Sequence, residues 1–362
     1  MSRILSVPEF LAAPGPILDV RSPSEFARGR VPGAVNFPLF TDDERAQVGT
    51  CYKQQGRDAA VELGLTFVGP NMAAMVGQAK ALARDRRVRV HCWRGGMRSA
   101  SVAWLLKTAG FEVVTLAGGY KSFRRWCLER FEQPKTIVIL GGMTGSGKTD
   151  ILHALAKLGE PVLDLEGLAC HRGSSYGGLM QQPQPSTEQF ENDIALRWDA
   201  FAPLRPIWIE GESQCIGTCR IPQVLFEQMM RSPVVQIERS RAERIAYLVE
   251  IYGAANREQL VAATERIRKR LGGARSQAAV NAIRQGNLGP AADLILDYYD
   301  KTYTYDLARR AAPILTVDVS QQSARATANL LRDRVTSNLE GTHSALPQMT
   351  SAIGLQADRV VL

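Results

Sequence analysis

One glycine-rich segment limits the possible folds of this chain more than any other feature. TIVILGGMTGSGKTD, residues 136–150, matches the pattern G-x-x-x-x-G-K-[ST], follows an apolar strand-like run and precedes a helical pattern. In such a loop the backbone amides wrap phosphate oxygens, the lysine neutralises terminal phosphates and the threonine hydroxyl can hold Mg²⁺. The segment therefore predicts a parallel sheet that binds a phosphorylated ligand. The candidate binding residues are Gly142, Gly145, Ser146, Gly147, Lys148 and, as the metal ligand, Thr149.

The same pattern continues after this loop. The apolar runs PVLDLEG, PIWIEGES and PVVQIER alternate with helical segments, which predicts a doubly wound P-loop NTPase-like domain over residues 131–335. Beyond about residue 240 the chain becomes helical and rich in arginine, as in TERIRKRLGGAR, residues 264–275. We therefore expect a helical, arginine-rich extension of this domain. Residues 336–362 show little periodicity and are assigned to a C-terminal tail.

Residues 1–130 form another unit of the same class. Short apolar runs such as ILDV and RVRVHC alternate with helical stretches, one of which begins with a capping box of Ser22 and Glu25. This alternation indicates a parallel sheet with helices on its faces. FEQPK, residues 131–135, is interpreted as the linker between the two units. The chain is thus predicted to be an α/β protein of two domains.

The segment HCWRGGMRSA places Cys92 where a strand ends and a helix begins. Gly95 and Gly96 permit the positive φ values with which successive amides turn toward one point. These amides, the helix N-terminus, Arg94 and Arg98 would favour an anion at this point and make the thiol a nucleophile near neutral pH. We interpret Cys92 as a reactive thiolate rather than a buried structural cysteine.

Other polar residues follow the strands of the second unit. LDLEGLACHRGSSYGG comes directly after a strand and lies at the carboxyl edge of the predicted sheet, where ligands bind in such folds. Within it, His171 is a candidate general acid, a phosphate ligand or an ordinary loop residue, and Arg172 is a candidate phosphate ligand. Glu210 or Glu212, in the segment IWIEGES, could hold a metal-bound water or act as a base.

Composition limits the partners and the compartment. The 44 lysines and arginines exceed the 36 aspartates and glutamates by 8, which is compatible with a polyanionic partner. The six cysteines are too dispersed for a disulfide framework, and Cys215 and Cys219 lack further zinc ligands at suitable spacing. The N-terminus has no signal-peptide pattern and no window approaches a membrane span, so we expect a cytoplasmic protein without a membrane partner.

Several motifs of the first unit together closely resemble the rhodanese domain. They are an Asp-Val-Arg strand end, a Glu-Phe helix, a Gly-x-Val-Pro-Gly-Ala turn, a loop opening with cysteine and a closing Leu-x-Gly-Gly. Arg30 stands where rhodaneses commonly have histidine. The resemblance implies that Cys92 carries sulfur or selenium, although His-Cys-x5-Arg also fits the phosphate cradle of dual-specificity phosphatases. The motifs fall on Asp19, Arg21, Glu25, Gly29, Pro32, Gly33, Ala34, Cys92, Gly118 and Gly119.

The order of motifs over residues 5–335 resembles the tRNA 2-selenouridine synthase family. After the rhodanese motifs come GGMTGSGKT, LDLEGLACHRGSSYGG, PSTEQFEN, WIEGES and LDYYDKTYTYD. GESQCIG departs from the more basic sequence expected there, which leaves the roles of Gln214 and Cys215 open. The resemblance implies that selenium replaces sulfur in 2-thiouridine at the tRNA wobble position. It further implies selenophosphate as the selenium donor and a preceding alkylation of the sulfur by geranyl diphosphate.

On this resemblance the two units divide the chemistry. Lys148, Thr149 and Arg172 would hold the diphosphate, with Mg²⁺ as a possible cofactor, and Cys92 would handle selenium. The arginine-rich helices would contact the tRNA, and a tyrosine cluster would either stack an extruded base or pack in the core. The members of that cluster are Tyr298, Tyr299, Tyr303 and Tyr305.

Two other functions fit parts of the sequence. One is a P-loop kinase or NTPase with a regulatory rhodanese module, in which Arg241 and Arg244, three residues apart, belong either to a lid or to a solvated helix face. The other is a chalcogen carrier or sensor without chemistry of its own. Labelled selenium would then remain on Cys92 and never reach RNA.

Overall fold

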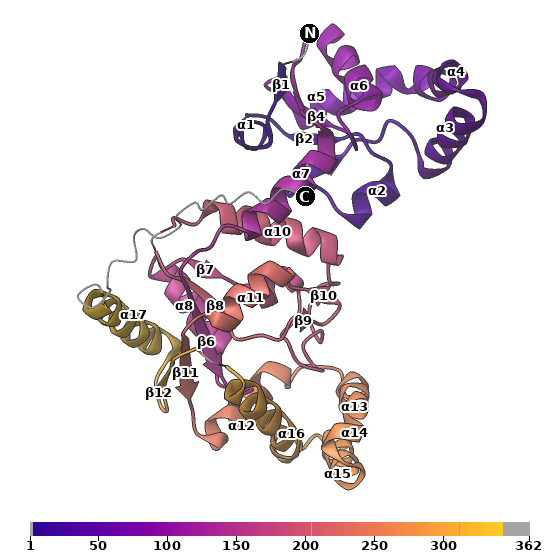
Figure 1. Cartoon of the computed structure of the whole chain (residues 1–362). Helices are drawn as coiled ribbons and strands as arrows, with labels where there is room; N and C mark the ends of the chain where they lie inside the picture. The colour runs from indigo at the N-terminus through magenta and orange to yellow at the C-terminus, as the bar shows by residue number, and fades with distance from the viewer. Residues whose placement is uncertain (1–2, 204, 311, 343–362) are drawn as a thin grey trace, which may run out of the picture.

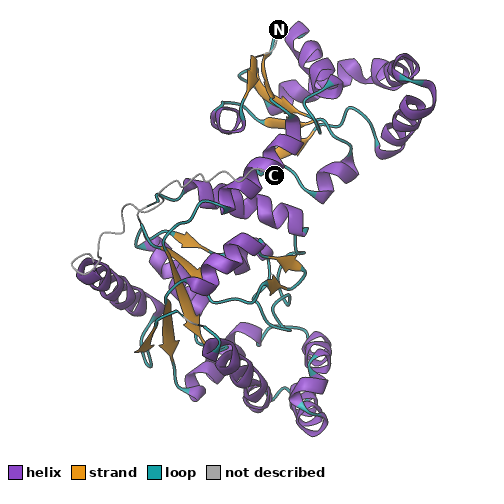
Figure 2. Cartoon of the chain, viewed as in Figure 1, coloured by secondary structure: helices purple, strands orange, loops and turns teal. Residues whose placement is uncertain are grey.

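The computed structural model describes residues 3–203, 205–310 and 312–342. Figure 1 shows two units, with the first part of the chain in the upper one and the remainder in the lower one. In Figure 2 each unit contains a sheet with helices around it. The predicted class is therefore confirmed: two α/β units follow one another, and helices dominate the later part of the second.

The first sheet is parallel and has the strand order β1-β5-β4-β2-β3. At the start of α2, Glu25 accepts a hydrogen bond from the Ser22 amide at 3.2 Å, which confirms the capping box. Because β4 is the central strand, Cys92 lies at the carboxyl edge of the middle of the sheet. The elements are β1 (Arg3–Leu5), α1 (Val7–Ala12), β2 (Ile17–Asp19), α2 (Pro23–Arg28), β3 (Ala34–Asn36), β4 (Arg87–His91), α6 (Met97–Thr108), β5 (Glu112–Leu116) and α7 (Gly119–Phe131).

A series of helices connects β3 to β4. It comprises α3 (Asp42–Gln55), α4 (Arg57–Val68), a 3₁₀ turn (Gly69–Asn71) and α5 (Met72–Leu82), of which the sequence pattern predicts only α5. In contrast to the sequence prediction, Arg57–Leu82 is long and apolar enough to cross a membrane by length and composition alone. Only 17% of its most apolar window is buried, and one such segment is weak support for a membrane span. Its side chains that pack into the domain include Ala60, Met75 and Ala79.

The second sheet is also parallel, in the order β12-β11-β6-β8-β7. The sequence pattern does not predict β12, which pairs with β11 after a long helical stretch. Side chains of β6 alternate between the faces, as in any strand. Val138 and Leu140 share an apolar cluster with α8 and α17, whereas Ile139 shares one with α10 and α11. The elements are β6 (Ile137–Gly142), α8 (Lys148–Lys157), β7 (Val162–Leu163), α9 (Leu165–Ala169), α10 (Thr187–Ala200), β8 (Ile207–Glu210), α11 (Gln223–Arg231), β11 (Val234–Glu238), β12 (Ile314–Asp318) and α17 (Ala324–Thr342).

Part of the predicted tail belongs to α17. That helix continues to Thr342, so residues 336–342 are helical. Residues 343–362 lie outside the described part of the chain. A two-stranded antiparallel hairpin, formed by β9 (Cys215–Ile216) and β10 (Cys219–Arg220), stands apart from both large sheets.

A group of helices between β11 and β12 builds its own apolar cluster. Within it, Arg241 binds Asp293 at 2.6 Å, and Arg244 binds Asp300 at 2.8 Å. Arg244 is only 3% exposed. These arginines therefore hold two helices together; Arg244 is buried and does not belong to a solvated face, whereas the Arg241 side chain is 40% exposed. The helices are α12 (Arg241–Tyr252), α13 (Arg257–Arg266), α14 (Arg268–Leu271), α15 (Gly273–Arg284) and α16 (Leu288–Ala308).

One apolar cluster spans both domains. It contains Phe123 and Trp126 of α7 together with Phe190 and Trp198 of α10, all buried. Polar contacts surround it: Arg124 of α7, for example, donates a hydrogen bond to the side-chain oxygen of Asn192 in α10 at 2.6 Å. The domains are thus joined by a packed helix pair as well as by the chain between α7 and β6.

Candidate functional site

The phosphate-binding loop joins β6 to α8, as the motif predicts. Gly145 and Gly147 have φ values of 81° and 78°, which residues with side chains rarely adopt. A Cβ atom on Gly145 would lie 2.8 Å from the carbonyl oxygen of Arg244 in α12. Ser146 is 1% exposed, and its hydroxyl has no hydrogen-bond partner within the described ranges. Glycine conformations and the contact with α12 therefore fix the loop that would wrap an anion.

Lys148 begins α8 and reaches back over the loop. Its Nζ donates a hydrogen bond to the carbonyl oxygen of Gly142 at 2.8 Å and lies 5.1 Å from the ring centroid of Tyr303 in α16. Burial alone would lower the pKa of this ammonium, but Tyr303, Glu212 and Glu166 together raise it. Lys148 is therefore a fixed positive charge inside the site.

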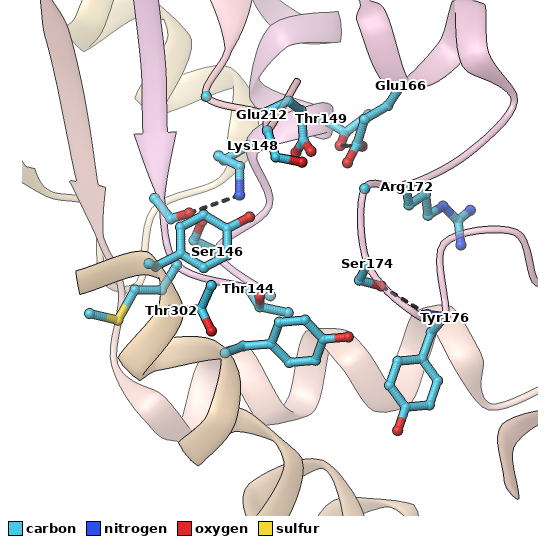
Figure 3. Close-up of a pocket in the computed structure, with 18 of the residues that line it drawn as sticks. Thr144, Ser146, Lys148, Thr149, Glu166, Arg172, Ser174, Tyr176, Glu212 and Thr302 are labelled. Atoms are coloured by element: carbon cyan, nitrogen blue, oxygen red, sulfur yellow. Dashed lines mark hydrogen bonds between the residues drawn. The ribbon is translucent and has the colours of Figure 1, made fainter. Parts of the chain in front are cut away.

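Two carboxyl groups lie beside Lys148 and Thr149, as Figure 3 shows. The Thr149 hydroxyl donates a hydrogen bond to Glu166 at 2.9 Å, and Glu166 is hydrogen-bonded to Glu212. Burial, and then the charge of Glu166, raises the pKa of Glu212 to about 8. Burial is also the largest cause of the raised pKa of Glu166. The pair therefore retains a proton near neutral pH.

Glu210, one of the two glutamates singled out from the sequence, is separated from the cavity and contacts the backbone of Glu166. It ends β8, is 2% exposed and accepts a hydrogen bond from the amide of Glu166 at 2.6 Å. Burial, followed by the charge of Asp164, raises its pKa well above the ordinary value. Glu210 does not line the cavity, whereas Glu212 does. The geometry thus favours Glu212 over Glu210 as a group that meets a ligand.

Mg²⁺ would find a small but suitable set of ligands here. Among residues 3–203, 205–310 and 312–342, no three His, Cys, Asp or Glu side chains form a metal-binding group. However, Mg²⁺ commonly keeps several waters and binds one or two carboxylates plus substrate phosphates. The Thr149 hydroxyl and the Glu166 carboxylate, already in contact, fit that set.

Arg172, in the loop after α9, lies on the cavity wall across from Lys148 (Figure 3), and its neighbour His171 also lines the cavity. Nη1 of Arg172 is buried and has no hydrogen-bond partner in the part of the chain that is described. An unsatisfied guanidinium nitrogen is suited to binding an anion. Burial, followed by the charge of Arg266, lowers the pKa of His171, so its ring is neutral near pH 7.

These residues share one cavity of about 1670 Å³, and every residue that lines it belongs to the second domain. One end is formed by the phosphate-binding loop. Tyr298, Tyr299 and Tyr303 line the cavity, whereas Tyr305 does not. The cavity therefore joins the phosphate-binding loop to a second part, here called the apolar chamber, whose wall is largely aliphatic but also carries Arg266 and Arg270. The apolar side chains from α12 to α16 that line it include Leu248, Ile251, Leu260, Ile267, Ile283, Leu288, Ile295 and Leu296.

Cys92 lies in the first domain, directly after β4. Its Sγ is 3.2 Å from the hydroxyl of Ser99 and 4.0 Å from the carbonyl oxygen of Gly96, and the residue is 3% exposed. Gly95 has the predicted positive φ of 66°, but Gly96 has a φ of −98°, which any residue can adopt. Only the first glycine is therefore required by the backbone conformation.

The two arginines of the Cys92 loop differ in their surroundings. Arg98 donates a hydrogen bond to the Glu25 carboxylate of α2 at 2.7 Å, so its charge is already paired. Arg94 is exposed and forms no ion pair with another described residue. Arg94 is thus better placed than Arg98 to bind an incoming anion. The phosphatase interpretation uses Arg98 to hold a phosphoryl group, so the pairing of Arg98 with Glu25 weakens that interpretation.

The Leu-x-Gly-Gly segment closes on the Cys92 loop. Gly119 has a φ of 60°, and a Cβ atom there would lie 2.4 Å from the carbonyl oxygen of Cys92 and 2.5 Å from the amide nitrogen of Gly95. The amide of Tyr120 donates a hydrogen bond to the same Cys92 oxygen at 2.9 Å. The two backbones are therefore in direct contact, and only glycine fits between them.

The sequence pattern does not predict the contacts of some of these groups. Ser99 contacts the thiol, but a serine in the first turn of a helix gives no distinctive signal. Tyr303 contacts Lys148 from α16, more than 150 residues further along the chain. Glu166 belongs to the LDLEG segment, which the sequence pattern places at the carboxyl edge of the sheet, but that pattern does not predict its contact with Thr149.

The fold and the two sites define a rhodanese domain fused to a P-loop domain. Residues 7–125 match the rhodanese-like domain family, and residues 135–335 match the family described as "tRNA 2-selenouridine synthase AAA domain". The chain belongs to the tRNA 2-selenouridine synthase family.

Relatives with the name "tRNA 2-selenouridine synthase" match most of this chain and most of their own length. The relative from Marinobacter nauticus is 38% identical over 336 residues, which cover 83% of this chain and 90% of the relative. The relative from Cupriavidus pinatubonensis is 36% identical over 337 residues, which cover 83% and 91%. The relative from Bordetella bronchiseptica is 38% identical over 337 residues, which cover 83% and 90%. The similarity therefore extends over both domains.

Proposed function

We propose that this enzyme replaces sulfur by selenium in 2-thiouridine at the wobble position of tRNA, in two steps at two sites. The second domain binds geranyl diphosphate and transfers the geranyl group to the sulfur. The first domain then binds selenophosphate and exchanges the geranylthio group for selenium. The shared name of the relatives supports the overall reaction.

The observation that carries the first step is the composition of the cavity. A cationic end formed by Lys148 and Arg172 continues into the apolar chamber along the helices α12 to α16. The lining of this chamber is largely aliphatic and includes Arg266 and Arg270 at the cavity opening. An isoprenoid diphosphate has the same two parts, a charged head and an apolar chain. A nucleotide would present its polar ribose and base to the chamber instead. The pairing of Arg241 and Arg244 with aspartates of α16 also leaves these arginines less available to a nucleotide phosphate than the kinase alternative requires.

In the first step a C–O bond of the diphosphate ester breaks and a C–S bond forms to the thiouridine. Pyrophosphate leaves, and the base loses its N3 proton. The charges of Lys148 and Arg172 stabilise the negative charge that develops on the leaving group. Mg²⁺, bound by Thr149 and Glu166, would add to this neutralisation.

In the second step a C–Se bond forms at C2 of the base, geranylthiol leaves, and water cleaves the Se–P bond to release phosphate. Selenium in selenophosphate is already at the selenide level, so this exchange needs no oxidant. A perselenide on Cys92 would need one. We therefore assign Cys92, with Arg94 and the loop amides, to binding and orienting the donor rather than to carrying oxidised selenium.

Separate assays of the two half-reactions test this division. Cys92→Ala should retain geranyl transfer to thiolated tRNA and lose selenation, whereas Lys148→Ala should lose geranyl transfer. Mass spectrometry of the tRNA nucleosides reports both products. Loss of geranyl transfer with retained selenation in Cys92→Ala would overturn the assignment, as would ATP-dependent phosphoryl transfer by the wild-type enzyme without any change in tRNA.

A further inference from the structure

Two groups of basic residues in the helical part of the second domain differ in how their charge is balanced. The arginines of α12 are paired with aspartates of α16. In contrast, four of the five residues 266–270 are cationic, and their single ion pair among the described residues joins Arg268 to Glu265 at 3.7 Å on the surface. An exposed pair of this kind neutralises little charge. The segment 266–270 therefore carries an excess of positive charge that the fold does not balance.

This basic segment lies at the opening of the cavity. Arg266 and Arg270 are exposed, yet both also line the cavity. The Arg266 guanidinium donates a hydrogen bond to the hydroxyl of Ser175 in the loop after α9 at 3.3 Å, and Arg270 donates one to the hydroxyl of Tyr298 at 3.1 Å. Neither bond involves a carboxylate. The segment is thus held at the cavity edge by neutral partners, with its charges available.

We propose that α14, through Arg268, Lys269 and Arg270, binds phosphates of the anticodon arm and so brings the wobble base to the cavity. This inference rests on the proposed function in taking thiouridine as the reacting group. An RNA backbone carries one negative charge per nucleotide, which three adjacent cations can match. An anionic membrane would also attract them, but the cavity that the segment borders holds the proposed site of the reaction on tRNA, so we assign these charges to RNA.

The test uses the double variant Arg268→Gln/Lys269→Gln, because neither residue lines the cavity. Its dissociation constant for thiolated tRNA is measured over a range of salt concentrations. We expect binding about tenfold weaker at low salt, and a salt slope smaller by about 1 to 2, as for the loss of one or two phosphate contacts. The matched control is Lys53→Gln/Lys157→Gln, which removes the same charge from two exposed helix positions elsewhere.

Each outcome decides the proposal. An unchanged salt slope, an equal loss in the control variant, or a wild-type enzyme that does not bind tRNA would overturn it. So would a variant that loses binding to phosphatidylserine vesicles but retains tRNA affinity. Binding of geranyl diphosphate without tRNA is measured in parallel and should be unchanged in the double variant. If the wild-type enzyme does not bind geranyl diphosphate, the proposed function fails while the result for tRNA still stands.

Discussion

The hydroxyl of Tyr120 donates a hydrogen bond to the carboxylate of Glu188 at 2.8 Å, which connects the two domains. The same hydroxyl accepts a bond from the side-chain amide of Asn192 at 2.9 Å, while the Tyr120 amide holds the carbonyl oxygen of Cys92. The Arg21 guanidinium stacks 3.8 Å from the Tyr120 ring centroid. One residue thus contacts the Cys92 loop with its backbone and the second domain with its side chain.

Tyr120→Phe should destabilise the protein through this contact. The ring and its stacking remain, but Glu188 and Asn192 each lose a partner near the domain interface. Asn192 keeps its hydrogen bond to the Arg30 carbonyl oxygen, so the loss is that of ordinary hydrogen bonds, about 0.5–1.5 kcal/mol each, and the thermal midpoint should fall by a few degrees. Tyr305→Phe is the control, because Tyr305 is 62% exposed. Equal midpoints for the two variants would show that the interface does not depend on the hydroxyl.

Gly119→Ala should impair the first domain selectively. The added methyl group would overlap the carbonyl oxygen of Cys92, so the loop must move. We expect selenation to fall by at least about tenfold, on the scale at which misplaced catalytic groups lose activity. Binding of geranyl diphosphate should be retained. Gly33→Ala tests backbone strain alone, since Gly33 has a φ of 78° but nothing within 4 Å of the added carbon; a similar loss there would assign the effect to strain.

His91 should make the fold sensitive to acid. The residue is fully buried, and burial lowers the pKa of its ring below 6.5 although Asp19 opposes this shift. A group with a lowered pKa stabilises the fold above its unfolded pKa and loses that contribution as the pH falls through the folded value. Stability should therefore decline below about pH 6.5, by up to about 1.4 kcal/mol per pH unit.

Thermal midpoints between pH 7 and pH 5 measure this effect. His91→Gln should flatten the dependence on pH, because it removes the buried ring whose pKa is lowered. Parallel curves for wild type and His91→Gln would contradict the assignment.

Ile295→Ala separates the apolar chamber from the phosphate-binding end. Ile295 lines the cavity and is 9% exposed. Removing its methyl and methylene groups should weaken geranyl diphosphate binding by about 1–2 kcal/mol, or roughly tenfold. Binding of inorganic pyrophosphate should not change, whereas Lys148→Ala should weaken both ligands. Calorimetric titration measures the dissociation constants of both ligands for each variant and for the wild type. Equal losses for the two ligands in Ile295→Ala would show that the geranyl chain does not bind in this chamber.

Local motifs predicted most of the architecture, and long-range contacts account for what was missed. The glycine loop before Lys148 and the Cys92 loop are short, continuous signals, so their place at strand ends could be predicted. The strand β12 follows a long helical stretch, and no local pattern indicates that it returns to the sheet. The choice between Glu210 and Glu212 depended on where β8 ends, and strand boundaries are the least certain feature of a sequence pattern.

The cavity of the second domain includes no residue of the Cys92 loop, and this separation has a kinetic consequence. The alkylated base must therefore leave this cavity before it meets Cys92. On the proposed function, the anticodon itself serves as the carrier, and it can exchange through solution. Neither Cys92→Ala nor Lys148→Ala should convert thiouridine to selenouridine alone. A mixture of the two variants should complete the conversion, because the alkylated tRNA can pass from one enzyme molecule to the other.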